Sequence, residues 1–130
     1  MSTGDDFRAA VEARDLDAIS ACLAQDVEFF SPVGFKPFIS RPVVTALLGF
    51  VIETFEEFVY VDAIEQGSSR MLRFSARIGD KAIDGVDLLE LGDDGLIRRF
   101  SVMLRPLSAA QAMADAMSAR FEVAGGKPGA

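Results

Sequence analysis

The sequence predicts an α+β fold in which helices pack on the concave face of one curved, cone-shaped antiparallel sheet. Apolar residues recur at helical spacing in the first 55 residues, whereas apolar and polar side chains alternate from residue 58 to residue 105. Turn residues divide that second region into four segments. Helices followed by a run of short strands are typical of helices laid on one face of an antiparallel sheet.

Length and composition indicate a single globular domain. The chain has 130 residues, of which 50% are apolar and 25% are charged, and its eleven phenylalanines supply much of the bulk of a core. We expect residues 1–124 to form this domain. Residues 125–130 are rich in glycine, and we expect them to be a flexible C-terminal tail.

Charge and residue usage argue against several classes of function. The net charge of −7 and the lack of a Lys/Arg-rich run make a nucleic-acid partner improbable, and we expect the arginines of residues 70–99 to form cross-strand ion pairs. With no histidine and one cysteine, we expect no metal site and no cofactor. The chain shows neither a signal peptide nor a membrane-length apolar run, and a lone buried Cys22 fits a reducing cytoplasm.

Two helices are predicted before the first strand. Ser2 and Thr3 precede Asp5 and Asp6, a pattern that favours a helix start, and this first helix should cover residues 4–13. Asp15 offers a second N-cap, and the apolar residues that follow it at helical spacing predict a short helix that ends near residue 24. Together they should form a helical hairpin.

The third and fourth helices flank the predicted sheet in the sequence. Ser40 can cap the third helix, Pro42 fits its first turn, and a wide apolar face extends to Phe55. The last helix begins at residues 106–108 and carries an apolar stripe that is more typical of core or dimer contact than of a ligand site. The stripe consists of Met113, Met117 and Phe121.

Five strands follow from alternation and turn signals. Residues 27–31 form the first, which Pro32 and Gly34 close as a turn. The turn segments 66–68, 79–80 and 92–95 separate the others, so these should form an antiparallel meander. The four strands of this meander are predicted at residues 58–65, 69–78, 81–91 and 96–105.

Asp87 is the main candidate for chemistry. Alternation along residues 81–91 places Asp87 on the same face as Ile83, Gly85 and Leu89, where it is the only charged residue. A carboxyl group in apolar surroundings loses hydration, so its pKa should rise and it could donate a proton as a general acid/base or an oxyanion donor. The alternative is a structural aspartate bonded to Tyr60 or to backbone amides.

The same concave face predicts the lining of a small-molecule pocket. Ser31 ends a strand beside a turn, where no histidine or lysine is available to activate it, and its hydroxyl more often bonds the turn backbone. Phe35 and Phe38 would line the pocket mouth or pack in the core. The predicted ligand-binding residues are Phe7, Phe29, Ser31, Phe35, Phe38, Phe55, Tyr60, Phe74, Phe100, Val102 and Leu104.

Two segments, RDLDAISACLAQDVEFFSPVG and GVDLLELGDDGLIRRFSVML, carry a family resemblance. The chain resembles the ketosteroid isomerases and SnoaL-like polyketide cyclases of the nuclear-transport-factor-2-like superfamily, which implies a cystatin-like cone. On this resemblance the isomerase base falls on Ser31 and the oxyanion tyrosine on Phe7, so ketosteroid isomerase activity is not expected. The second isomerase acid falls on Asp87, which also suits the single acid/base aspartate of the cyclases.

Three functions therefore remain open from the sequence. The chain is an isomerase-like or cyclase-like enzyme acting through Asp87, a module that binds a small apolar molecule without turnover, or a dimerisation domain whose core is filled. We also expect a homodimer through the outer face of the sheet, because no helix is left to cover it. Four apolar side chains lie on that face among arginines and acids: Met71, Val86, Leu88 and Met103.

Overall fold

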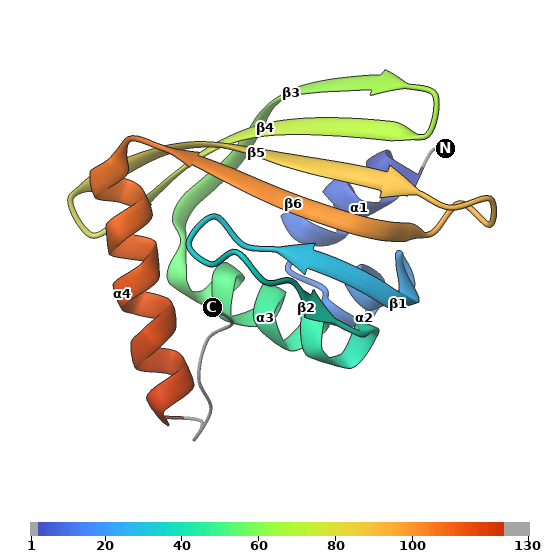
Figure 1. Cartoon of the computed structure of the whole chain (residues 1–130). Helices are drawn as coiled ribbons and strands as arrows, with labels where there is room; N and C mark the ends of the chain where they lie inside the picture. Colours follow the sequence, from blue (N-terminus) through green and yellow to red (C-terminus); the bar gives the residue numbers. More distant parts are fainter. Residues whose placement is uncertain (1–2, 124–130) are drawn as a thin grey trace.

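The computed structural model describes residues 3–123, with side chains from residue 4 to residue 119. This part of the chain forms four helices and one six-stranded sheet (Figure 1). In chain order the elements are α1 (Thr3–Glu12), α2 (Leu16–Ala21), β1 (Leu23–Phe30), β2 (Phe38–Ile39), α3 (Arg41–Thr54), β3 (Glu56–Gln66), β4 (Ser69–Ile78), β5 (Lys81–Leu91), β6 (Ile97–Arg105) and α4 (Leu107–Val123).

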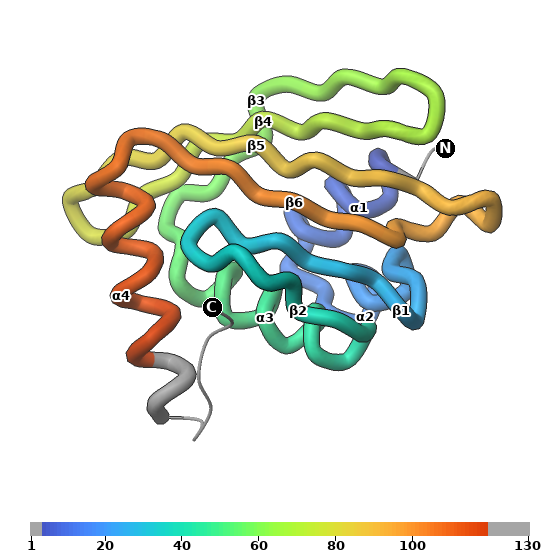
Figure 2. Tube along the Cα trace, in the orientation of Figure 1, coloured from blue at the N-terminus to red at the C-terminus, as the bar shows by residue number. Residues whose placement is uncertain are grey.

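The sheet has the strand order β2-β1-β6-β5-β4-β3. Strands β3 to β6 form the predicted antiparallel meander, in which each strand folds back beside the one before it (Figure 2). Strand β1 joins β6 in parallel, and β2 pairs antiparallel with β1. Helices α1, α2 and α3 lie on one side of the curved sheet, and α4 runs down one end of it (Figure 1). The predicted α+β class is confirmed.

The N-terminal hairpin agrees with the sequence except where it meets the sheet. Asp15 caps α2, since its carboxylate accepts a hydrogen bond of 3.1 Å from the amide of Ala18. The expected end of this helix near residue 24 is wrong, because α2 ends at Ala21 and β1 begins at Leu23. The amide of Ile97 donates to the carbonyl of Cys22 at 2.8 Å, so pairing with β6 decides the boundary.

The start of α3 also differs from expectation. Ser40 occupies the N-cap, but its side chain makes no capping hydrogen bond and its φ is 97°. The Ser40 amide donates instead to the carbonyl of Val27 at 3.0 Å, which ties the start of α3 to β1. This contact follows the two-residue strand β2, which the sequence did not predict. Pro42 lies in the first turn of the helix, as expected.

The meander matches the prediction closely. Strands β4 and β5 have the predicted bounds, and β6 begins one residue later than predicted, at Ile97. Strand β3 begins earlier, at Glu56, and forms one edge of the sheet. Its pairing with β4 is interrupted twice, between Glu56 and Val59 and again between Tyr60 and Asp62. Such interruptions increase the local bend and twist of a strand.

Aromatic side chains fill the centre of the core. Phe100 lies against Phe7, with ring centroids 5.3 Å apart in an edge arrangement, and against Phe29 at 5.2 Å. Met113 and Met117 of α4 are buried in the same cluster, as the predicted stripe required. The side chain of Phe121 and the predicted tail at residues 125–130 lie outside the described part of the chain.

A glycine permits close contact between β4 and β5. Gly85 lies opposite Phe74 on the concave face. A Cβ atom at residue 85 would overlap the Phe74 ring and would lie 2.8 Å from Cδ2 of Leu104. The ring of Phe74 therefore occupies the space that any larger residue at position 85 would need.

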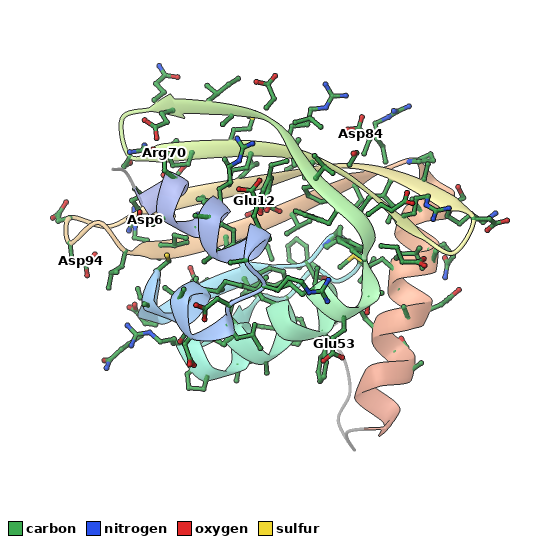
Figure 3. All side chains as sticks on the ribbon, turned by 180° about the vertical axis from the view of Figure 1, so that it is seen from behind. Asp6, Glu12, Glu53, Arg70, Asp84 and Asp94 are labelled. Atoms are coloured by element: carbon green, nitrogen blue, oxygen red, sulfur yellow. The ribbon has the colours of Figure 1, made fainter. Side chains whose placement is uncertain are left out.

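The outer face carries the predicted cross-strand ion pairs. Asp84 binds Arg73 at 3.0 Å through two hydrogen bonds and Arg105 at 3.4 Å, and Arg99 pairs with Glu28 at 3.4 Å. Figure 3 shows Asp84 on the side of the sheet away from the helices. In the described residues, no helix has both the length and the apolar character that a membrane span requires.

Candidate functional site

A cavity of about 280 Å³ lies between the concave face of the sheet and the helices. Every helix and every strand except β2 contributes to it, and most of its lining is aromatic or aliphatic. The lining residues are Phe7, Val11, Glu12, Arg14, Ile19, Phe29, Leu48, Val51, Ile52, Phe55, Glu57, Phe58, Tyr60, Phe74, Asp87, Phe100, Val102 and Met113.

Asp87 is the one buried charged residue among the side chains that the structure describes, with 6% of its surface exposed. It lies on the inward face of β5, between Leu72 of β4 and Val102 of β6. The hydroxyl of Tyr60 donates a hydrogen bond of 3.0 Å to its Oδ2 atom. Among the described residues, no other group donates a hydrogen bond to this carboxyl group, so its Oδ1 atom has no protein donor there.

Burial shifts the pKa values of both Asp87 and Tyr60. Loss of hydration raises the pKa of Asp87 to about 7, and the hydrogen bond from Tyr60 opposes this rise. Burial and the neighbouring Asp87 raise the pKa of Tyr60 well above its ordinary value. Near neutral pH, Tyr60 therefore keeps its proton while Asp87 is present in both protonated and ionised forms, as proton transfer to and from a ligand requires.

Tyr60 is positioned by aromatic and cationic neighbours. The ring of Phe58 meets it edge-on, with centroids 4.9 Å apart, and Phe58 in turn stacks on Phe74 at 4.8 Å. The Arg8 guanidinium also lies over the Tyr60 ring, 5.8 Å from its centroid. These contacts hold the hydroxyl of Tyr60 toward Asp87 and form an aromatic wall of the cavity.

Three charged residues line the cavity where it approaches the surface: Glu12, Arg14 and Glu57, all exposed. They are called the rim residues below. Glu12 is the last residue of α1 and is labelled beside that helix in the view from behind (Figure 3). Arg14 and Glu57 have positive φ values of 55° and 52°, in the left-handed region that non-glycine residues seldom adopt.

Eight of the twelve predicted site residues line this cavity. They are Asp87 together with Phe7, Phe29, Phe55, Tyr60, Phe74, Phe100 and Val102. The predicted concave face therefore brings these residues together, although Phe7, Phe29 and Phe55 lie outside the meander.

The other four predicted residues, Ser31, Phe35, Phe38 and Leu104, lie outside the cavity lining. The hydroxyl of Ser31 accepts hydrogen bonds from the Val33 and Gly34 amides at 3.2 and 3.1 Å, so it serves the turn. Phe35 is 91% exposed in the following loop. Phe38 packs against the core from β2, and Leu104 borders a groove beside Phe35.

Sequence reasoning missed most of the helical lining and all three rim residues. Leu48, Val51 and Ile52 belong to the apolar face of α3, so the helical period identified them as buried without showing that they face a cavity. Arg14 lies in a turn and Glu57 lies at an irregularity of β3. Neither helical spacing nor strand alternation predicts where a side chain points at such positions. Among the described residues, no cluster of three or more potential metal ligands is present.

Comparison with known proteins places this geometry among related folds. The sequence profile of the SnoaL-like domain matches residues 5–100. A protein of cystatin-like fold from Silicibacter pomeroyi DSS-3 is 37% identical with a TM-score of 0.89, over 92% of this chain and 85% of that one. A steroid delta-isomerase from Pseudomonas aeruginosa is 35% identical with a TM-score of 0.89, over 94% and 90% of the two chains.

A more distant structure shares the fold alone. A candidate SnoaL-like polyketide cyclase from Shewanella denitrificans OS-217 is 16% identical with a TM-score of 0.66, over 90% of this chain and 95% of that one. A search of the curated proteins finds no match.

Proposed function

Because this chain belongs to the SnoaL-like domain family, we propose that its cavity binds a small apolar molecule and that Asp87 moves a proton on it. The observation that carries this proposal is the burial of Asp87 in the lining of an apolar cavity, where Tyr60 binds only one of its two carboxyl oxygens. In the ionised form, Oδ1 of Asp87 accepts a proton from an acidic C–H or O–H of the ligand. The same group then returns the proton to another ligand atom, while Tyr60 stabilises the carboxylate by donating to Oδ2.

The cavity supports a ligand that is largely apolar and carries one oxygen. Its aromatic and aliphatic lining would bury a ring system, and displacement of water would strengthen the interaction of the ligand oxygen with Asp87. A ketone with hydrogens on the adjacent carbon meets both conditions, because loss of such a proton places charge on the oxygen. Proton abstraction next to a carbonyl group is therefore the reaction that suits the site.

Asp87→Asn is expected to reduce proton exchange at least tenfold, because the amide cannot accept and return a proton. The measurement is deuterium incorporation next to the carbonyl of one- to three-ring ketones, including 1-tetralone, followed by NMR in D₂O. Asp80→Asn is the matched control, since Asp80 is exposed in the turn between β4 and β5. Exchange by the wild type that is unchanged in Asp87→Asn would reject Asp87 as the acid/base.

Wild-type protein is not expected to isomerise a Δ5-3-ketosteroid at a useful rate, although a 35% identical protein is named as a steroid delta-isomerase. Ser31 lies at the position expected for the base, but its hydroxyl binds two turn amides and is a weak base. Phe7 offers no hydrogen-bond donor. The rate of isomerisation is measured from the ultraviolet absorbance of the conjugated enone that forms. Rapid isomerisation would mean that another residue replaces the missing base.

A binding module without turnover is the second candidate function. The hydrogen bond from Tyr60 already satisfies one oxygen of Asp87, as expected if Asp87 only orients a polar group of a ligand. Fluorescence titration with 2-naphthol tests binding separately from catalysis. Saturable binding without exchange of any ketone would favour the binding module over the enzyme, and the absence of binding would count against both.

We also propose a homodimer through the outer face of the sheet. Met71 and Met103 are 40% and 59% exposed on this face, and Leu88 is half-buried between them. Leu88→Arg should shift the protein toward monomer in light scattering at micromolar concentration, because it adds a charge and removes apolar area at the centre of the interface. A wild-type protein that scatters as a 14.0 kDa monomer would disprove the dimer.

A further inference from the structure

The rim residues differ in how their charges are neutralised. Glu12 pairs with Arg8 of the same helix at 3.6 Å, and Glu57 pairs with Arg77 of β4 at 2.9 Å. The Arg14 guanidinium donates one hydrogen bond of 3.2 Å to the carbonyl oxygen of Ile52 in α3. Among residues 4–119, no carboxylate forms an ion pair with Arg14. The two acids of the rim are therefore neutralised, whereas no carboxylate in the described part of the chain neutralises Arg14.

The backbone at Arg14 provides a second observation. Arg14 follows the end of α1 with a φ of 55°, a position after a helix where glycine is the favoured residue. The Arg14 amide donates to the carbonyl of Val11, and the Asp15 amide donates to that of Ala10, both at 3.0 Å. A side chain in the left-handed region raises the energy of the fold, and such residues cluster at functional sites, so this conformation supports a role for the Arg14 side chain.

The hydrogen bond to Ile52 fixes where the guanidinium lies. Ile52 and Arg14 both line the cavity, and they come from α3 and from the turn after α1, so their contact bridges two sides of it. A guanidinium has five N–H donors in a planar fork, and the contact with Ile52 uses one of them. Donors therefore remain for a ligand that extends outward from the apolar interior.

We propose that Arg14 determines specificity by binding a carboxylate at the outer end of the ligand. This inference rests on the proposed binding function of the cavity and adds the class of ligand: a monocarboxylate with an apolar ring body and an oxygen that reaches Asp87. The planar fork of Arg14 matches a carboxylate through two parallel hydrogen bonds. Glu12 and Glu57 lie on the same rim, but they are already paired with Arg8 and Arg77, so their repulsion of a ligand carboxylate is weakened.

The test compares two probes of equal shape, 6-hydroxy-2-naphthoate and its neutral amide, 6-hydroxy-2-naphthamide. We expect the wild type to bind the acid about fivefold more tightly than the amide at low salt, with the preference falling as salt rises. Fluorescence titration gives both affinities. Arg14→Gly should abolish the preference, because it should lower the affinity for the acid about fivefold more than the affinity for the amide.

Arg14→Gly is suited to this test because glycine fits the left-handed turn without strain, so the variant should fold at least as well as the wild type. Arg98→Gln is the matched control for the loss of one positive charge, since Arg98 is exposed on β6 and does not line the cavity. It should keep the preference, and Arg14→Lys should keep part of it.

Each outcome bears on the proposal. Equal affinities of the wild type for acid and amide would overturn the role of Arg14 while leaving the binding function intact. A preference that persists in Arg14→Gly would also overturn it, because another cation would then hold the carboxylate. If neither probe binds the wild type but 2-naphthol does, the cavity admits no substituent on the side of Arg14 and the inference fails. Binding of none of the three would reject the binding function as well.

Discussion

Asp87→Asn is expected to stabilise the folded protein by up to about 4 kcal/mol at about pH 8, and to change its stability little at about pH 4. Burial raises the pKa of Asp87 from 3.8 to about 7 in the folded protein, a difference worth about 4 kcal/mol. The folded state therefore holds this proton more tightly than the unfolded state does. Stability from the protonated group is present below the unfolded pKa and is lost as the pH rises through the folded pKa.

The asparagine variant removes this dependence because it stays neutral at every pH. Its side-chain oxygen can still accept the hydrogen bond that Tyr60 donates to Asp87. Denaturant unfolding of wild type and variant at several pH values gives the difference in the free energy of unfolding, which cancels the contributions of the other carboxylates. A difference that does not change between acid and alkaline pH would mean that Asp87 titrates near its ordinary value.

Gly85→Ala is expected to destabilise the protein by about 1–3 kcal/mol, because the added methyl group overlaps the ring of Phe74 and approaches Leu104. Phe58 stacks on the ring of Phe74 and Phe55 lies against it at a tilt, and both restrict the space into which this ring can move. The cost is therefore expected to be overpacking of the core rather than a change in backbone preference. The free energy of unfolding from denaturant titration measures it.

A double-mutant cycle separates these two causes. Phe74→Leu shortens the side chain that the new methyl group meets, so Gly85→Ala should cost less in that background than in the wild type. If the cost is the same in both backgrounds, the ring of Phe74 is not the obstacle, and the glycine at residue 85 is needed for its backbone conformation.

The sequence predicted well those features that a regular period controls. Alternation along β5 placed Asp87 on an otherwise apolar inward face, and the turn residues gave the bounds of β4 and β5 correctly. The alternation along β4 and β6 also placed Phe74 and Phe100 on the inward face of the sheet, with Asp87. In these strands the direction of each side chain follows from its position, so the local alternation is sufficient to predict which residues face the core.

Features that depend on contacts between distant segments were not predicted. Leu23 is buried whether it ends a helix or begins a strand, so its pattern could not show that pairing with Ile97 would draw it into the sheet. Ser31 was included in the predicted pocket and lies outside it, but its hydroxyl binds the local turn amides, the role that the sequence favoured. Arg14 and Glu57 reach the rim through left-handed backbone conformations, which polar side chains do not reveal in a sequence.

The irregular edge strand β3 has a consequence for the behaviour of the protein at high concentration. A long, flat edge strand exposes a row of unpaired amide and carbonyl groups on which another chain can add a strand and begin an aggregate. Strand β3 is eleven residues long, but its two irregularities interrupt the regular spacing of these groups, and it carries the exposed acids Glu56, Glu57, Asp62 and Glu65. The two irregularities of β3 lie beside Glu57, a rim residue, and beside Tyr60, which binds Asp87. They therefore also make this edge of the sheet a poor template for fibril growth.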